Sequence, residues 1–324
     1  MRRARVPVAL PWLACLLLAW PRRAAADEGG AGFWVPGQVG SFVAQPVAAG
    51  WSLPVVYFHA DAAAGAEKHF TRGGHIVGGI DDRTDLVYVT PTYTLSRPVA
   101  GAQAAASLSW AFGGATSSVS ATIAGVGGGT VTAGESGDVT GGCDLAPQLS
   151  LKWSGGAHSG MAYVTANVPT GSYDVNRLAN LGLHHWAWDL GGAYTYADET
   201  RGRELSATLG LTWNAENPAT DYRNGIDGHL DWELSKVVSK PLRLGGAGYL
   251  YQQLTADTGA GALLGEFKSS AVGLGPEVGY SFQPGARSWD AELKVYWDLA
   301  AADRPAGWNL WMSTSIPIGP PGSP

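Results

Sequence analysis

The chain has 324 residues and a formal net charge of −6, with 46 Gly, 14 Trp and only 15% charged residues. Soluble domains usually carry about 25% charged residues and less Trp, so the composition disfavours an ordinary soluble domain. An acidic chain without a basic cluster is also a poor candidate for binding nucleic acid. Abundant Gly and aromatic residues instead favour many short strands whose aromatic side chains lie between apolar and aqueous surroundings.

Residues 1–26 form a predicted signal peptide. Three Arg lie within the first five residues, residues 6–20 are apolar, and three Ala at 24–26 offer a cleavage site. The apolar run is shorter than the roughly 20 residues that a helix needs to cross a bilayer. Removing this segment takes away five Arg and no acidic residue, so the net charge falls from −6 to −11. Only Cys143 remains, and no intramolecular disulfide can form.

Residues 27–52 are rich in Gly, Pro and aromatic residues, as in Gly32-Phe33-Trp34-Val35-Pro36-Gly37. They follow neither the helical period nor the alternation of a strand. We expect this stretch to be either a periplasmic extension or a plug folded into the lumen of a barrel.

The first half of the remaining chain contains weaker strand candidates. They cover residues 53–60, 86–95, 103–112, 117–124, 145–153 and 159–168. The segments between them at 61–85 and 125–142 are expected to be loops, and the second is rich in Gly.

The second half alternates apolar and polar residues with a period of two. In residues 203–214, Leu, Ala and Trp fall on one face, while Glu, Ser, Thr and Asn fall on the other. Residues 185–196, 229–234 and 291–299 repeat the pattern. Because side chains alternate across a strand, each segment is expected to be a strand with one apolar and one polar face.

These patterns predict an all-β fold, a transmembrane antiparallel up-and-down β-barrel of about 12 strands over residues 53–318. The apolar faces are rich in Leu, Val and Ala, with Trp or Tyr near the ends, as on a lipid-facing surface bordered by aromatic girdles. Strands of about 10 residues match a tilted bilayer crossing, and a closed barrel leaves no backbone group unpaired in lipid. Residues 319–324 are expected to be a disordered tail.

Loop lengths predict which end of the barrel faces outward. The longer connections lie on one side, at 169–184, 215–225, 252–269 and 301–306. The shorter ones lie on the other side, at 154–159, 197–202, 239–241 and 283–287. Outer-membrane barrels have short periplasmic turns, so the longer set is expected to be extracellular.

The polar strand faces are expected to point into the lumen, where water or mutual pairing compensates their charge. The predicted lumen residues are Asp189, Glu204, His229, Asp231, Glu233, Arg243, Glu277, Glu292, Lys294 and Asp298. Their functional interpretation is a narrow, acidic-lined conduit. The alternative is a sealed structural barrel whose lumen is filled by ion pairs.

Enzymatic and metal-binding interpretations find little support in the sequence. A barrel lipid hydrolase needs a Ser activated by a His, but the adjacent His158 and Ser159 would face opposite sides of a strand. His184 and His185 lack accompanying residues at metal-site spacing. We therefore expect no catalytic residues, no metal and no cofactor, and we keep an outer-membrane lipid hydrolase as a second alternative.

Several short motifs together resemble one family of exported proteins, the family labelled as the putative meta-pathway of phenol degradation. They are Gly32 to Gly37, Pro169-Thr170-Gly171-Ser172-Tyr173, Asn180-Leu181-Gly182, Thr220-Asp221-Tyr222-Arg223-Asn224-Gly225, Gln253 to Gly259 and Leu274-Gly275-Pro276. The resemblance extends from about Gly32 to about Ile316. It implies an outer-membrane channel of a Gram-negative bacterium for passive uptake of small hydrophobic or aromatic compounds.

The motif loops are expected to form the extracellular mouth and to contact the solute. The residues concerned are Thr170, Tyr173, Asn180, Asn217, Asp221, Tyr222, Arg223 and Asp257. Tyr and Arg side chains can stack on a ring, whereas Asn and Asp more often bond their own backbone in turns. The expected partners are outer-membrane lipid, the solute and the barrel-assembly machinery, with no nucleic acid; the oligomeric state is left open.

Overall fold

The computed structural model describes residues 32–69, 75–124, 130–262, 268–283 and 289–318. The predicted signal peptide and the predicted tail at 319–324 lie outside these ranges. Within them, no helix is long and apolar enough to cross a membrane. The described chain forms the strands β1 (Gly50–His69), β2 (His75–Val89), β3 (Thr92–Thr94), β4 (Gln103–Ala124), β5 (Thr130–Gly142), β6 (Ala146–Gly155), β7 (His158–Asn167), β8 (Ala187–Asp198), β9 (Arg203–Asn214), β10 (Asp227–Val237), β11 (Leu242–Gln253), β12 (Ser270–Phe282), β13 (Trp289–Ala302) and β14 (Ala306–Ile318).

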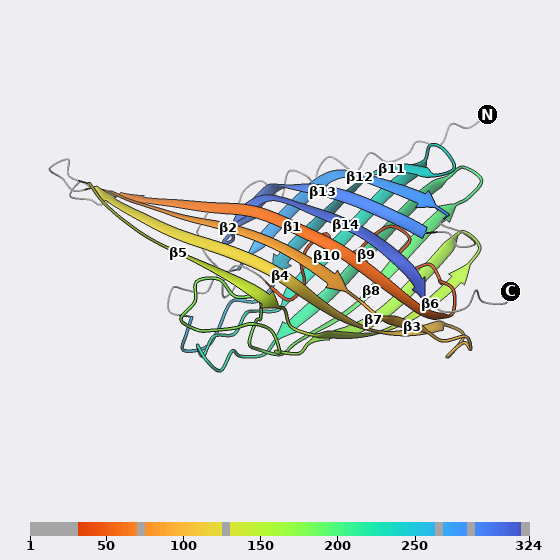
Figure 1. Ribbon diagram of the computed structural model, residues 1–324, viewed down its shortest axis with the longest axis horizontal. Coiled ribbons are helices and arrows are strands. Elements are labelled where there is room, and N and C mark those ends of the chain that lie inside the picture. The colour runs from red at the N-terminus through yellow and green to blue at the C-terminus, as the bar shows by residue number, and fades with distance from the viewer. Residues whose placement is uncertain (1–31, 70–74, 125–129, 263–267, 284–288, 319–324) are drawn as a thin grey trace, which may run out of the picture.

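Twelve of these strands close into an antiparallel barrel (Figure 1). They follow the order β1, β2, β4 and then β6 to β14, and β14 pairs back with β1 from Trp51↔Ile318 to Ala63↔Ala306. The remaining two strands lie off this ring, since β3 pairs with β1 and β4, and β5 pairs with β4. The all-β barrel of about 12 strands predicted from the sequence is confirmed.

Strand β9 shows how the two faces of the wall differ. Leu209 is 63% exposed on the outside, whereas Glu204 is 2% and Thr212 is 0% exposed on the inside. A broad exterior surface of Leu, Val and Trp has no favourable contact with water, so it is the surface that lipid covers. The alternation predicted for the second half of the chain therefore gives the orientation of the side chains correctly.

The first half departs from the prediction, because the two expected loops are largely strands. Residues 61–85 belong mostly to β1 and β2, which pair without interruption from Val55↔Val89 to His69↔His75. Residues 130–142 form β5, which pairs with the C-terminal half of β4, residues 112–124. The strand candidates at 103–112 and 117–124 are one strand, β4, of 22 residues. At about 3.3 Å per residue β4 is roughly twice as long as a bilayer crossing requires.

The long strands project beyond one end of the barrel (Figure 1). This is the end that carries the connections after β7, β9, β11 and β13, which the loop lengths predict to be extracellular. The projecting residues are mainly Ala, Gly, Ser and Thr, whose small side chains do not produce the apolar alternation of a lipid-facing strand. Their strand structure comes from backbone pairing, which the side-chain pattern does not reveal.

The interior contains a buried apolar cluster on one side, here called the apolar wall. Phe58 and Trp311 lie at its centre with ring centroids 4.4 Å apart, and both are nearly fully buried. Val35, Tyr88 and Leu181 pack against it. The apolar wall consists of Phe58, Leu86, Ala111, Ala247, Tyr249, Tyr251, Ala271, Tyr296 and Trp311.

Candidate functional site

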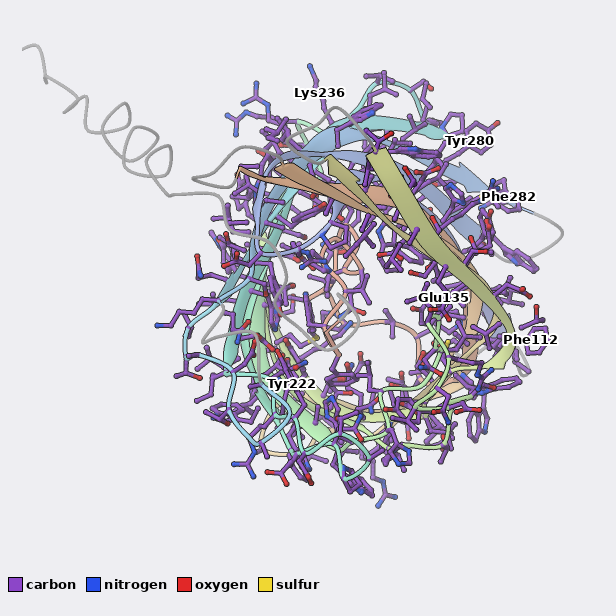
Figure 2. The ribbon with its side chains drawn as sticks, turned by 90° about the vertical axis from the view of Figure 1, so that its left-hand side faces the viewer. Phe112, Glu135, Tyr222, Lys236, Tyr280 and Phe282 are labelled. Atoms are coloured by element: carbon purple, nitrogen blue, oxygen red, sulfur yellow. The ribbon has the colours of Figure 1, made fainter. Side chains whose placement is uncertain are left out.

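Residues 32–49, here called the inner segment, lie inside the ring of strands (Figure 2). Gly32 lies beside the Tyr251 hydroxyl near the end of β11 that leads into the outer loops. Val47 exchanges two hydrogen bonds with the Gln103 side chain at the start of β4, at the opposite end of the barrel. The inner segment therefore runs through the interior before the chain enters the wall at β1.

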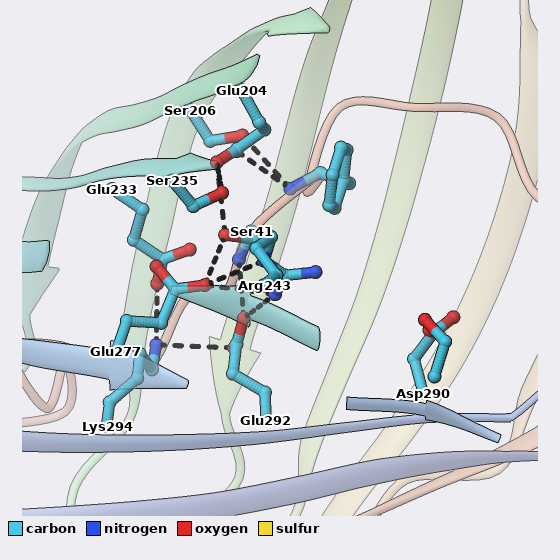
Figure 3. Close-up of polar contacts among 12 residues, drawn as sticks. Ser41, Glu204, Ser206, Glu233, Ser235, Arg243, Glu277, Asp290, Glu292 and Lys294 are labelled. Carbon is cyan, nitrogen blue, oxygen red and sulfur yellow. Dashed lines mark hydrogen bonds and ion pairs between the residues drawn. The ribbon is translucent and has the colours of Figure 1, made fainter. Parts of the chain in front are cut away.

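Acidic residues on the inner face of the wall bind the middle of the inner segment (Figure 3). The Ser41 hydroxyl lies 2.8 Å from Oε1 of Glu277 and 3.2 Å from Oε2 of Glu204. The Ser41 amide donates to Oε1 of Glu292 at 3.3 Å. The Phe42 amide donates to Oε1 of Glu204 at 3.2 Å. Carboxylates from β9, β12 and β13 thus converge on two consecutive residues.

Lys294 binds the inner segment from the other side of the same cluster. Its ammonium group donates to the carbonyl oxygen of Gly37 at 2.9 Å and to that of Val39. It also pairs with Oε1 of Glu233 at 2.8 Å, and both side chains are almost fully buried. The Gly37 amide in turn donates to Oδ1 of Asp231 at 3.1 Å. One residue of the inner segment is therefore held through both its N–H and its C=O.

Gly37 is required at this point by space and by backbone conformation. Its φ of 85° is a left-handed value, and a Cβ atom would lie 2.8 Å from the Tyr296 ring. Any other residue would clash with the ring and strain the backbone. The Gly in the N-terminal motif thus allows the chain to approach Lys294 closely.

Arg243 links two of the carboxylates that bind Ser41. Its guanidinium lies 2.9 Å from Glu277 and 2.7 Å from Glu292, and it stands 4.9 Å from the centre of the Phe42 ring. A cation over an aromatic face gains additional attraction. The guanidinium thereby fixes Glu292 in position to accept the Ser41 amide and Glu277 in position to accept the Ser41 hydroxyl.

Trp34 packs against side chains on the inner face of β7 and β10. Its indole stacks on the His229 ring with centroids 3.6 Å apart and planes 13° apart, and the Tyr163 ring lies 6.1 Å away on a nearly parallel plane. His229 is held by Asp189, whose Oδ2 lies 2.8 Å from Nε2 and also accepts the Thr212 hydroxyl. This group lies nearer the outer loops than the carboxylate cluster does.

All ten residues predicted to line the lumen lie on barrel strands with their side chains buried or half-buried. Seven of them, Glu204, His229, Asp231, Arg243, Glu277, Glu292 and Lys294, contact the inner segment directly. Asp298 instead accepts the Tyr249 hydroxyl and the Gly307 amide. The sequence placed these residues on the inner face but gave no sign that backbone amides of residues 37–42 would be their partners.

The outer loops place several of the predicted mouth residues in contact with one another. Asp257 accepts the Tyr222 hydroxyl at 2.6 Å and the Gly225 amide at 3.2 Å. The Asn217 side chain donates to the Tyr173 hydroxyl at 3.0 Å. Tyr173 also stacks on the His184 ring at 4.4 Å. Both tyrosines thus connect different parts of the outer loops.

The other mouth residues have similar local contacts. Thr170 accepts the Leu145 amide, and Asn180 accepts the Asp174 amide. Asp221 adopts a left-handed φ of 53°, and Arg223 lies 3.8 Å from Glu216. The Asn176 amide donates to Asp174 and holds the pKa of this exposed carboxyl below its usual range. The contacts of Asp174 with Asn176 and Asn180 stabilise a turn.

Asp144 organises the first outer loop, and sequence analysis missed it. Its Oδ1 accepts the amides of Thr170 and Gly171, and its Oδ2 accepts the Leu183 amide and the Asn167 side chain. These donors lie at both ends of residues 168–186, so one buried carboxylate closes the loop. The signal that could have identified it is an isolated acidic residue directly before a predicted strand, which is common and therefore uninformative.

The candidate hydrolase pair is not assembled. His158 is exposed and lies 2.6 Å from the Tyr194 hydroxyl, whereas Ser159 is buried and donates to Ser154. Neighbouring positions of β7 thus face opposite sides, as expected from the sequence. Among the described residues, Glu233, Glu277 and Glu292 lie close enough together to share a metal ion, but Lys294 and Arg243 already supply cations to them.

The closed barrel, its apolar exterior and its N-terminal segment inside define a membrane barrel of the outer-membrane type. The chain belongs to the family described as "Putative MetA-pathway of phenol degradation", whose model matches residues 60–314. The family resemblance found in the sequence is therefore confirmed. Comparison with curated proteins gives no match.

One of the solved structures similar to this chain shares its fold. The crystal structure of the COG4313 outer membrane channel from Pseudomonas putida F1 superposes with a TM-score of 0.59 at 14% identity, covering 86% of this chain and 99% of that one. The translocator domain of autotransporter NalP from Neisseria meningitidis gives 0.36 at 14% identity, covering 82% and 88%. Pseudomonas aeruginosa OccK10 (OpdN) gives 0.33 at 12% identity, covering 84% and 99%. The first score shows a common fold, and the other two are too low to define one.

Proposed function

We propose that this protein lets small hydrophobic or aromatic molecules pass passively across the outer membrane of a Gram-negative bacterium, without catalysing a reaction. The observation that carries the proposal is the apolar wall inside the barrel. Pores for polar solutes have polar interiors, whereas Phe58, Leu86 and Trp311 present a buried apolar surface here. Such a surface favours solutes that are themselves apolar.

The inner segment adds the second part of the proposal, because it is the element whose movement would open a path. It belongs to no strand and is held inside by hydrogen bonds, by ring stacking and by the cations of Lys152, Arg243 and Lys294. These contacts are reversible, whereas moving a wall strand would break its backbone pairing with two neighbours. Passage therefore requires displacement of the inner segment and leaves the barrel intact.

Two further considerations support a transport role. The family name refers to phenol degradation, and the solved barrel with the shared fold is described as an outer membrane channel. The absence of a paired nucleophile and base around His158 and Ser159 disfavours the hydrolase alternative. Lipid of the outer membrane and the barrel-assembly machinery are then the expected partners.

A sealed structural barrel is the second candidate, favoured by how fully the inner segment is bonded. The two candidates differ in solute flux. Vesicles whose outer leaflet contains lipopolysaccharide, with and without the folded protein, would be tested for influx of the fluorescent aromatic 1-N-phenylnaphthylamine. We expect faster influx with the protein, and a further increase when residues 32–46 are deleted.

Two controls make this test decisive. Heat-dependent migration in detergent gels reports that both forms of the barrel are folded. His158→Ala should leave influx unchanged, because His158 is exposed and lies outside the proposed path. If neither the intact nor the deleted protein raises influx above that of protein-free vesicles, the barrel is sealed and the transport proposal is wrong.

A further inference from the structure

Trp34 occupies a position in the interior that is shaped to hold a flat ring. The position, here called the ring slot, is formed by Tyr163, Gly191, Gly210 and His229 from four consecutive barrel strands. The Trp34 indole lies on the His229 ring at 3.6 Å with nearly parallel planes, and it is only 5% exposed. Stacking of this kind is selective for planar aromatic groups.

Two glycines make the ring slot possible. A Cβ atom at Gly191 would lie 2.4 Å from the Tyr163 hydroxyl, and one at Gly210 would lie 2.6 Å from Nε2 of His229. Any larger residue at either position would therefore push a slot ring out of place. Asp189 restricts rotation of the His229 ring, because its Oδ2 lies 2.8 Å from Nε2 of His229. The ring slot is thus rigid and belongs to the wall itself.

Trp34, in contrast, is an imperfect occupant of the ring slot. Its indole Nε1 is buried and has no hydrogen-bond partner among the described residues, and Nδ1 of His229 is in the same situation. A buried Trp normally pairs its N–H group, and leaving the group unpaired weakens binding. Trp34 also belongs to the inner segment, so its ring can leave without breaking a strand pairing.

We infer that the ring slot is a binding site for a small, neutral aromatic molecule, which competes with Trp34 for the stacking surface of His229. The inference rests on the proposed function, because the competing ring is taken to be the transported solute. Trp34 and Val35 are neighbours, and Val35 packs on the apolar wall. Tyr251 of the apolar wall also pairs with His229 across β10 and β11. A solute that enters along the apolar wall therefore meets the ring slot, and its binding releases one end of the inner segment.

Competition has a measurable consequence for affinity. A site that is occupied by an internal group binds an external ligand with an affinity reduced by the fraction of time it is free. Removing the indole should therefore strengthen binding of the ligand, while removing the His229 ring should weaken it. From the usual strength of one aromatic stack, we expect roughly a fivefold change in each direction.

The test measures calorimetric binding of phenol to the full-length folded protein in detergent, with cyclohexanol as a ligand of similar size and equal hydroxyl content but no aromatic ring. Trp34→Ala should bind phenol more tightly, and His229→Gln, which keeps a donor for Asp189, should bind it more weakly. Neither substitution should change the affinity for cyclohexanol. Trp51→Ala is the matched control, since Trp51 is 54% exposed and lies outside the interior.

Unchanged phenol binding in Trp34→Ala, or an equal gain for cyclohexanol, would overturn the inference. Trp34 lies outside the wall, so Trp34→Ala remains informative even if His229→Gln fails to fold. The outcome is separable from that of the influx experiment. Influx without a Trp34 effect on phenol binding rejects the ring slot alone, whereas a Trp34 effect without influx rejects the transport function alone.

Discussion

Replacement of Lys294 by Met is the most direct test of what holds the inner segment in the barrel. The ammonium group donates to the carbonyl oxygens of Gly37 and Val39 and pairs with Glu233. Methionine keeps most of the side-chain volume and removes the charge. The change therefore separates the electrostatic hold on the inner segment from the packing around it.

Two effects of different size follow from Lys294→Met. A hydrogen bond to a charged group contributes about 1.5–3 kcal/mol, so losing two of them should weaken the hold on the inner segment by roughly 3 kcal/mol, or about a hundredfold in the ratio of bound to released segment. Glu233 is also left buried without its cation, which costs the barrel about 3–5 kcal/mol. The double variant Lys294→Met/Glu233→Gln removes that second effect and keeps the first.

Single-channel recording in planar bilayers provides the assay. Both the single and the double variant should spend far more time in a conducting state than the unaltered protein, and only the single variant should lose unfolding stability in urea. Lys236→Met serves as the matched control, because Lys236 is exposed at the end of β10 and lies outside the cluster. If both variants fold and conduct like the unaltered protein, Lys294 does not hold the inner segment and the reasoning fails.

Other substitutions test the wall, the ring slot and the loops. Leu209→Arg places a charge on the lipid-facing side, where Leu209 is 63% exposed, and should cost about 2–4 kcal/mol of unfolding free energy in lipid vesicles; an equal stability would contradict the assigned outer face. Gly210→Val should displace the Trp34 stack and lower stability by about 1–3 kcal/mol, whereas Gly160→Ala, with no neighbour within 4 Å of its Cβ, should be silent. Asp144→Ala leaves loop amides unpaired and should make residues 168–186 sensitive to limited proteolysis while the barrel stays folded.

The lipid-exposed part of the wall could be predicted because its side chains obey two constraints at once. In β9, lipid requires Leu, Ala and Trp on one face while the interior tolerates Glu, Ser and Thr on the other. The projecting parts of β1, β2, β4 and β5 are free of the first constraint. Their Ala, Gly and Ser residues resemble a loop in composition, so only the backbone pairing reveals the strands.

The sequence predicts where the residues of the interior site lie, but not which groups they bind. Alternation placed Glu204, Glu277 and Glu292 on the inner face, and the structure brings them together. Glu292 and Glu204 accept the main-chain amides of Ser41 and Phe42, and Glu277 accepts the Ser41 hydroxyl. An amide has no side-chain signature in a sequence. Residues 27–52 are predicted to be a periplasmic extension or a lumen plug. The inner segment within them lies inside the ring of strands, and residues 50–52 already belong to β1.

The charges of the interior predict how an open state would differ from the closed one. Four carboxylates, from Glu204, Glu233, Glu277 and Glu292, surround only two cations, Arg243 and Lys294. Buried charges without partners are costly, and the amides and hydroxyl of the inner segment supply the missing partners. When the inner segment leaves, water must replace it around these charges, while the neighbouring apolar wall, whose Trp311 pairs directly with Lys294 across β13 and β14, still suits an apolar solute. The conducting state should therefore prefer cations, as the reversal potential in a KCl gradient would report. Glu204→Gln/Glu292→Gln should reduce that preference in the protein lacking residues 32–46, and an anion-selective current from it would contradict the assigned charges.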